Sequence, residues 1–307
     1  MPALSPVEIA ANRKPTRLIV SIGANNGLWS LAFNAAGSPG FDITNGLYGP
    51  QDVADCRTFI NSLASLPQDI QHIYINALPF PSTTANMMPI PDKEINKPPK
   101  PRQLWANYEN RFGLTYGTLT RTQLQKNNKT MRDLATFITS TIKKTKDPRI
   151  HIVPIDKIFL DYDYKTNRKA KFVPAPDDQR KLSNIMIDSY TDLAGTHWYG
   201  GLVGLDGMHP TIVGYNLMAS TILDTIKNFE PNLPIPNPLP TVAEAYQADT
   251  LITNVPDQWH PVLYTWRDIR KAFHTGLAIS DDEATRSVKS LMSIVSKLGS
   301  GPARKLR

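Results

Sequence analysis

The sequence predicts an α/β protein whose core is a parallel β-sheet with helices on both faces. Three short runs rich in β-branched residues, at residues 17–22, 70–76 and 149–155, have the composition of buried strands. Stretches with apolar residues at helical spacing separate these runs. Alternation of strand and helix is typical of a parallel sheet, because each right-handed crossover places a helix against one face.

The first half of the chain supplies two of the predicted strands. The run RLIVSI, from Arg17 to Ile22, ends where Gly23 stops the strand. A helix is expected over residues 52–66, and the chain then returns in the second run, IQHIYIN, at residues 70–76. A proline-rich turn closes this second strand.

The third strand lies between two long helical stretches. One helix is expected over residues 121–146, the run RIHIVPI follows at residues 149–155, and a further helix begins after Pro210. The buried faces of these helices carry apolar residues at helical spacing, which are Leu134, Phe137, Ile138 and Ile142 in the first and Ile212, Tyr215, Leu217, Met218, Ile222 and Ile226 in the second. The stretch KLSNIMIDSYTDLAG, at residues 181–195, is also expected to be helical.

Two proline-rich segments interrupt the pattern. Residues 80–102 contain six prolines and two consecutive methionines, and they form either a connector or a flap that shelters an acyl chain. Residues 231–240 are expected to be an extended linker. Beyond it, residues 266–273 and 284–298 predict a helical appendage that docks or dimerises. The expected domains are therefore 1–228, a linker over 229–242, and a helical extension over 243–307.

Composition excludes several classes of protein. The 307 residues, of which 41% are hydrophobic, are enough to form a core, and the single cysteine, Cys56, excludes an intramolecular disulfide or a cysteine-based zinc site. The net charge of +7 invites a nucleic-acid partner. The basic residues, however, lie in separate clusters without interleaved aromatics and without a nucleic-acid-binding motif, so no such partner is expected.

Two features of the sequence bear on the location of the chain in the cell. The apolar stretches are too short to span a bilayer, and the amino terminus lacks the apolar segment of a signal peptide. The chain is therefore expected to be cytoplasmic as encoded and without a membrane span, although a full-length parent protein could be exported.

The histidines give no sign of a metal site. His72 and His151 lie in predicted strands with apolar neighbours and are interpreted as strand histidines rather than ligands. The other histidines outside the motif described next have no carboxylate or histidine at metal-ligand spacing, and they are His197, His260 and His274. The pair Asp161 and Asp163 lacks the glycine and glutamate of a calcium loop and is interpreted as a polar turn. No metal or cofactor is expected.

The most informative motif is Asp206-Gly207-Met208-His209-Pro210. An aspartate three residues before a histidine can place its carboxylate at Nδ1 and leave Nε2 to act as a general base, which is the arrangement of a catalytic triad. A surface turn before a helix has the same pattern, so the tetrapeptide alone leaves both interpretations open.

A second motif, Gly23-Ala24-Asn25-Asn26-Gly27, follows the first predicted strand directly. In open α/β sheets, ligands gather at the carboxyl ends of the strands. Gly23 allows a sharp exit from the strand, and the amide of Asn25 can donate a hydrogen bond to a developing oxyanion. Glycine and asparagine are also common in ordinary turns, which is the alternative interpretation.

Together the two motifs resemble those of the SGNH or GDSL hydrolase superfamily, in which a G-x-N-D block supplies an oxyanion-hole asparagine and a D-x-x-H block supplies the acid and base of the triad. Gly23 and Asn25 match the first block, with Asn26 where the family usually has aspartate. Asp206 and His209 match the second in residue type, spacing and position before a helix. The resemblance covers residues 17–228 and implies a three-layer α/β/α, flavodoxin-like fold.

The family's nucleophile block, a strand ending in G-D-S, has no counterpart in its expected place. Only 22 residues precede Gly23, so the domain is expected to be amino-terminally incomplete. A sequence similar to the D-S-x-T-D of that block occurs at Asp188–Asp192, but Ile187 replaces its glycine and Ser189 lies only 17 residues before Asp206. Ser189 is therefore interpreted as part of a solvated helix face rather than as the nucleophile.

The resemblance implies an ester hydrolase that acts on a small ester or acyl substrate, with the nucleophilic serine absent from this chain. In it, His209 acts as general base and acid, Asp206 orients His209, and Asn25 with Gly23 and Asn26 lies at the oxyanion site. The alternative is a catalytically inactive remnant or binding module of the same fold.

The missing block also affects the predicted sheet, because the strand at residues 17–22 becomes an exposed edge. Exposed apolar edges associate with other strands unless they are covered. A complementary amino-terminal chain, a second copy of this chain or the helical appendage is expected to cover this edge.

Overall fold

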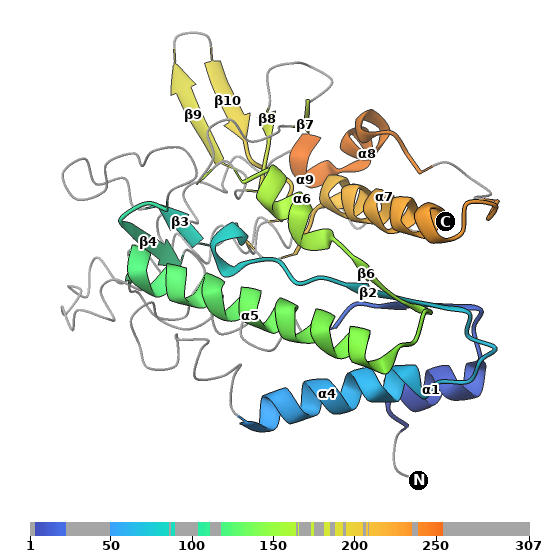
Figure 1. The fold of residues 1–307 in the computed structure, drawn as a ribbon. Helices are drawn as coiled ribbons and strands as arrows, with labels where there is room; N and C mark the ends of the chain where they lie inside the picture. The colour runs from blue at the N-terminus through green and yellow to red at the C-terminus, as the bar shows by residue number, and fades with distance from the viewer. Residues whose placement is uncertain are drawn as a thin grey trace.

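A computed structural model shows the fold of the 307-residue chain (Figure 1). The structure describes residues 4–22, 50–85, 87–89, 104–110, 118–163, 165, 173–174, 181–184, 188–192, 195–204, 207, 209–234 and 239–253.

A three-stranded parallel sheet forms the centre of the described fold. Its strands β1 (Arg17–Val20), β2 (His72–Asn76) and β6 (Ile150–Val153) lie in the order β1-β2-β6. Arg17 is paired with His72 across the first ladder, and Tyr74 is paired with His151 across the second. The predicted α/β class, the parallel sheet and its three strands are therefore confirmed.

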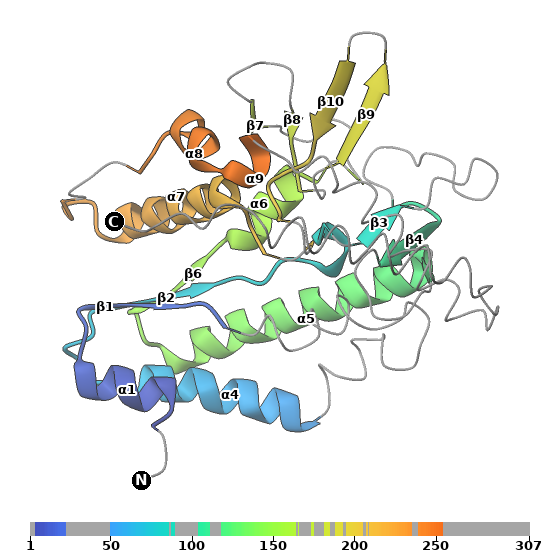
Figure 2. The same cartoon turned by 180° about the vertical axis from the view of Figure 1, so that it is seen from behind.

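Three helices cover one face of this sheet: α1 (Pro6–Arg13), α4 (Pro50–Ala64) and α5 (Arg121–Thr145) (Figure 2). Their apolar faces enclose a core cluster with alternate residues of the strands, and its buried members are Val20, Ile60, Leu63, Leu66, Ile70, Ile73, Ile142 and Ile150. Helices were expected near α4 and α5, whereas α1 was not expected. Ser5 and Glu8 form a capping box at the start of α1, with a hydrogen bond of 2.7 Å from Ser5 N to Glu8 Oε2.

The opposite face is covered by α7 (Ile212–Phe229), the helix predicted after Pro210, together with α6 (Ile155–Asp161). Tyr74 and Val153 from the strands pack with Ile155 and Ile226 in a second core cluster. The residue that follows α7, Glu230, contacts Arg17 at the first position of β1, so α7 runs antiparallel to the strands (Figure 1).

A small antiparallel sheet lies beyond the carboxyl end of β2. Its strands β3 (Met87–Pro89), β4 (Asn107–Asn110) and β5 (Thr118–Thr120) follow the short 3₁₀ helix η2 (Pro81–Thr83). Met87 is fully buried there against Tyr108 and Leu124. The described part of the proline-rich segment over residues 80–102 is therefore packed against α5, and the rest lies outside the described residues.

The helix expected over residues 181–195 is wrong. Short strands occupy this stretch: β8 (Lys181–Leu182), paired with β7 (Val173–Pro174), and β9 (Asp188–Asp192), paired with β10 (Gly195–Tyr199). In the β9–β10 ladder Thr191 is opposite Thr196 and Tyr190 is opposite His197. Threonine and tyrosine favour extended pairing, and the ladder outweighs the helical spacing of the isolated sequence.

After the proline-rich stretch that follows α7, α8 (Val242–Ala248) and α9 (Thr250–Thr253) complete the described chain. Ala245 and Tyr246 of α8 are buried against Leu202 and Val213. The helices predicted over residues 266–273 and 284–298 lie outside the described residues, and the division of the chain into three parts stays a prediction.

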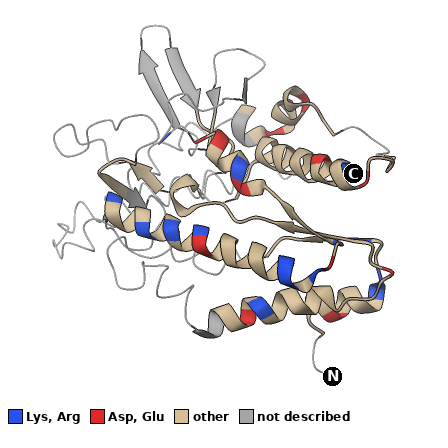
Figure 3. Cartoon of the chain, viewed as in Figure 1, with Lys and Arg blue, Asp and Glu red and all other residues tan. Residues whose placement is uncertain are grey.

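The charged residues of the described helices are distributed and mixed in sign (Figure 3). On α5, for example, Lys129 forms an ion pair with Asp133 one turn later. Within the residues that the structure describes, no helix combines the length and the apolar character needed to cross a membrane.

Candidate functional site

The start of α7 lies on the side of the sheet where the strands end. The 18 residues of α7 extend about 27 Å, whereas the five residues of β2 extend about 17 Å. Since the end of α7 sits over the first residues of the strands, its start reaches the carboxyl ends. This is the edge at which open α/β sheets bind their ligands.

The turn before α7 is tied to a neighbouring segment by backbone hydrogen bonds. Gly204 N donates to His209 O at 2.7 Å, Thr211 N donates to Leu202 O at 3.1 Å, and a bridge joins Val203 to Pro210. The chain therefore doubles back tightly between residues 204 and 209. Gly207, with φ of 71° in the left-handed region, lies within this turn, and its N–H donates to Gly204 O at 3.0 Å.

Two side chains cap the first turn of α7. Thr211 Oγ1 accepts a hydrogen bond from Gly214 N at 3.3 Å and donates one to Gly201 O at 2.8 Å. Asp249, which follows α8, accepts a hydrogen bond from Ile212 N through Oδ2 at 2.7 Å. The residue that follows α8 therefore helps to hold the start of α7.

Gly214 is required by a close backbone approach at the same point. A Cβ atom placed there would lie 2.3 Å from Leu202 O and 2.9 Å from Pro210 Cβ. Only a residue without a side chain allows α7 to pack this closely against the 202–210 turn.

His209 stands in this turn, two residues before the Thr211 cap, and its side chain is exposed. The structure describes the chain after β1 as far as Ile22. The other predicted site residues lie outside the described residues, and they are Gly23, Asn25, Asn26 and Asp206. Ser189 lies in strand β9 and not on a helix.

A buried polar network lies near the carboxyl end of β2. Lys165 Nζ donates hydrogen bonds to Thr84 O and, at 3.0 Å, to Met87 O. Asn184 Nδ2 donates to Thr83 O at 2.8 Å and to Asp163 Oδ1 at 3.3 Å. The polar turn expected at Asp161 and Asp163 is therefore not solvent-exposed throughout, since Asp163 is only 1% exposed.

Burial also lowers the pKa of the lysine in this network. The loss of hydration lowers the pKa of Lys165 to about 8, and the nearby Asp163 carboxylate opposes this change. Because Lys165 contacts backbone carbonyls of residues 84–87, it holds the segment between η2 and β3 in place. No sequence motif indicated this role, since the contacts join residues about 80 positions apart.

A second group of titratable residues lies at the other end of the sheet, where the strands begin. His72 and His151, predicted as strand histidines, do lie in β2 and β6, and His72 Nδ1 is 3.1 Å from His151 Nε2. Their neighbour Glu230 was not predicted as a site residue, because it is far from both in the sequence. Glu230 contacts side chains of β1 and β2, and only the folded chain brings these residues together.

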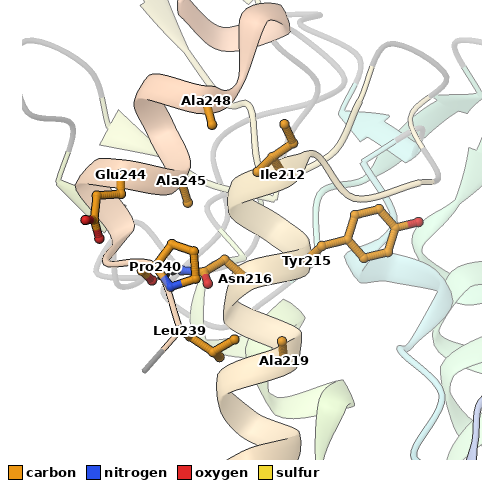
Figure 4. Close-up of a pocket in the computed structure, with 9 residues that line it drawn as sticks. All are labelled: Ile212, Tyr215, Asn216, Ala219, Leu239, Pro240, Glu244, Ala245 and Ala248. Atoms are coloured by element: carbon orange, nitrogen blue, oxygen red, sulfur yellow. Dashed lines mark hydrogen bonds between the residues drawn. The ribbon is translucent and has the colours of Figure 1, made fainter. Parts of the chain in front are cut away.

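Two further features bear on binding. Among the described residues, no group of three or more histidine, cysteine, aspartate or glutamate side chains has the geometry to hold a metal ion. A largely apolar groove of about 690 Å³ runs between the first half of α7 and the segment that includes α8 (Figure 4). Its lining residues are Ile212, Tyr215, Asn216, Ala219, Leu239, Pro240, Glu244, Ala245 and Ala248.

The chain was compared with known proteins in three ways. No protein-family model, no curated protein and no solved structure matches the chain.

Proposed function

We propose that this chain is the carboxy-terminal part of an ester hydrolase of the SGNH type, with a three-layer α/β/α, flavodoxin-like domain. In this proposal His209 is the general base and acid, Asp206 orients its imidazole, and Asn25 donates a hydrogen bond to the oxyanion with help from Gly23 and Asn26. The nucleophilic serine comes from a segment outside these 307 residues.

The observation that carries this proposal is the position of His209 relative to the sheet. The exposed histidine lies three residues before α7, whose start reaches the carboxyl ends of the strands, and β1 ends at that same edge three residues before Gly23 in the sequence. An acyl-transfer site needs a base and an oxyanion donor around one reacting carbonyl. The proposal brings together two motifs that lie about 180 residues apart in the sequence.

The state of β1 supports the second part of the proposal. Among the described strands, β1 pairs with β2 alone, and Ile19 and Ile22 are 49% and 53% exposed. An additional parallel strand beside β1 would satisfy the backbone of this edge and cover these side chains. A serine at the carboxyl end of that strand would reach the same edge as His209.

The proposal is tested by hydrolysis of short p-nitrophenyl esters. The chain alone is expected to hydrolyse them no faster than buffer. The product encoded by the DNA that extends upstream of Met1, if it carries a G-D-S strand, is expected to restore hydrolysis when it is present with the chain. In this combination, His209→Ala should lower kcat by about 10³-fold or more, because the base that activates the serine is lost.

His274→Ala is the matched control, since this histidine belongs to the predicted extension and should leave kcat unchanged. Activity of the chain alone that is abolished by Ser189→Ala would identify Ser189 as the nucleophile and overturn the assignment of an external serine. Activity that survives His209→Ala would show that His209 is not the general base. An upstream sequence without a serine-bearing strand would favour the second function.

That second function is a binding module without catalysis, and the groove along α7 favours it. The groove has mainly apolar walls, and the Asn216 amide spans it by donating to Pro240 O at 2.9 Å (Figure 4). Ligand sites of proteins commonly combine apolar walls with a few polar groups. A fluorescent apolar probe such as an anilinonaphthalene sulfonate that binds the native chain and is lost on Ala248→Arg, at an exposed position that lines the groove, would support this module.

A further inference from the structure

Five polar side chains converge where the end of α7 meets the first residues of the sheet strands. Arg17 comes from β1, His72 and Tyr74 from β2, His151 from β6, and Glu230 follows the last residue of α7. The strand register places the four strand residues on the face that α7 covers, since Arg17 pairs with His72 and Tyr74 with His151. We call these five residues the α7 anchor.

Glu230 binds the sheet through its carboxylate. Arg17 Nε donates to both carboxylate oxygens, at 2.9 and 2.8 Å, and Arg17 Nη2 donates to Oε2. Tyr74 Oη donates to Oε1 at 2.8 Å, and His72 Nε2 lies 3.6 Å from Oε2. The carboxylate is only 10% exposed, so these contacts fix the end of α7 in place rather than forming a mobile surface pair.

The two imidazoles extend this arrangement across the sheet. The 3.1 Å separation of His72 Nδ1 and His151 Nε2 is a hydrogen-bond distance, so one of these nitrogens carries a proton and the other accepts it. All contacts are satisfied when His151 Nε2–H donates to His72 Nδ1 and His72 Nε2–H faces Glu230. Phe229, the last residue of α7, stacks on His151 with ring centroids 3.8 Å apart.

We propose that the α7 anchor is a pH-sensitive latch, which holds the end of α7 on the sheet when the histidine pair shares a single bridging proton and loosens when both facing nitrogens are protonated. Two N–H groups cannot hydrogen-bond to each other across 3.1 Å, and two imidazolium charges at that distance repel. His151, 7% exposed and covered by Phe229, has no room to turn its charge toward water while the latch is closed.

The charges around the pair set the pH range of the latch. Burial first, and the neighbouring His72 second, lower the pKa of His151 below its ordinary value of 6.5, while Glu230 and Asp147 oppose this change. Arg149 pairs with Asp147, and Arg17 pairs with Glu230. Arg17 and Tyr74 hold the pKa of Glu230 below its ordinary value of 4.5, so this carboxylate stays charged at pH 5.

The lowered pKa of His151 determines whether the latch opens toward acidic or basic pH. A histidine whose folded pKa is lowered binds fewer protons in the folded than in the unfolded state at pH values below 6.5. The contribution of His151 is therefore fully present above pH 6.5 and declines as the pH falls below it. The latch opens toward acid, in a range where Glu230 is still ionised.

Hydrogen exchange of the intact chain, followed by mass spectrometry at pH 7.5 and 5.0 and corrected for intrinsic exchange rates, tests the latch. The amides that report on it are Glu230, which donates to Ile226 O at 2.7 Å, and Leu233, which donates to Glu230 O at 3.0 Å. Their protection should be lower at pH 5.0 than at pH 7.5, because the lowered pKa of His151 makes its protonation favour the open latch. Peptides from α5 should keep their protection.

The variant His151→Gln cannot take up a proton, and its protection near Glu230 should be the same at both pH values. His209→Gln is the matched control, because it removes a histidine at the opposite end of α7 and should leave the pH dependence intact. A wild-type chain without pH dependence at Glu230, or a His151→Gln variant with the wild-type dependence, overturns the latch.

A second measurement needs no fold-sensitive variant of His151. The Cε1 resonance of His151 in the wild-type chain should titrate with a midpoint below 6.5, and His72→Gln should raise that midpoint because a competing positive charge is removed. A midpoint at or above 6.5, or one that His72→Gln leaves unchanged, overturns the proposal. The latch does not depend on catalysis, so these outcomes are separate from those of the esterase assays.

Discussion

Replacement of Gly214 by alanine is the sharpest test of the packing that positions the start of α7. Gly214 lies in the first turn of this helix, where alanine would ordinarily stabilise a helix by about 1 kcal/mol relative to glycine. In this chain the added Cβ would lie 2.3 Å from Leu202 O, about 1 Å closer than a carbon–oxygen contact tolerates. Helix propensity and tertiary packing therefore predict opposite signs for the change in the free energy of unfolding of Gly214→Ala.

The magnitude follows from what must move. Separating Gly214 from Leu202 O breaks the hydrogen bond that Thr211 N donates to the same carbonyl, which costs about 1 kcal/mol. Displacing the Thr211 cap costs about another 1 kcal/mol, and the remaining overpacking costs about 1–3 kcal/mol. After the propensity gain is subtracted, Gly214→Ala should lower the free energy of unfolding by about 2–4 kcal/mol.

Urea unfolding followed by circular dichroism measures this change, and hydrogen exchange of residues 202–215 locates it. Ala219→Gly, one turn further along α7, is the control for propensity and should lose about 1 kcal/mol. An unchanged or increased stability of Gly214→Ala would mean that the 202–210 turn relaxes without cost, and the reasoning about the close approach would be wrong.

Three further predictions concern the sheet. Arg149→Met should lower the free energy of unfolding by about 3–5 kcal/mol, because it removes the guanidinium that pairs with the largely buried Asp147 carboxylate and donates to the carbonyls of Ala64, Leu66, Pro67 and Ile70. A loss below about 1 kcal/mol in urea unfolding would contradict this. Because the pKa of Glu230 is lowered in the folded chain, its carboxylate stabilises the fold above pH 4.5, and this stabilisation is lost as the pH falls. Glu230→Gln should remove this contribution and its pH dependence. Melting temperatures between pH 5.5 and 3.0 check this, and parallel curves for both proteins would disprove it. Ile19→Lys should leave the stability of the isolated chain within about 0.5 kcal/mol but weaken any association through the β1 edge; sedimentation velocity measures that association, and an assembly unaffected by the lysine does not use this edge.

Local patterns in the sequence were enough to predict the central strands and helices. The three β-branched runs became β1, β2 and β6, and the apolar spacing of α4, α5 and α7 was sufficient to predict those helices. The capping box of Ser5 and Glu8 was also present in the sequence and could have predicted α1. Each of these signals lies within one element, and burial of the resulting apolar faces reinforces it.

The misassigned stretch shows where local signals end. Residues 188–192 have apolar and polar residues at spacings compatible with a helix, but they pair with β10 instead. A strand is stabilised by its partner, which the spacing of a single segment does not contain.

Composition and periodicity by themselves determined the class of this protein, the order of its parallel strands along the chain and the motifs around Asn25 and His209. Only the tertiary structure decided that Glu230 meets Arg17 and His72, that Lys165 and Asp163 are buried, and that Gly214 touches Leu202. The physical reason is range: helix and strand preferences act over a few residues, whereas these contacts depend on strand register and on the direction in which α7 crosses the sheet.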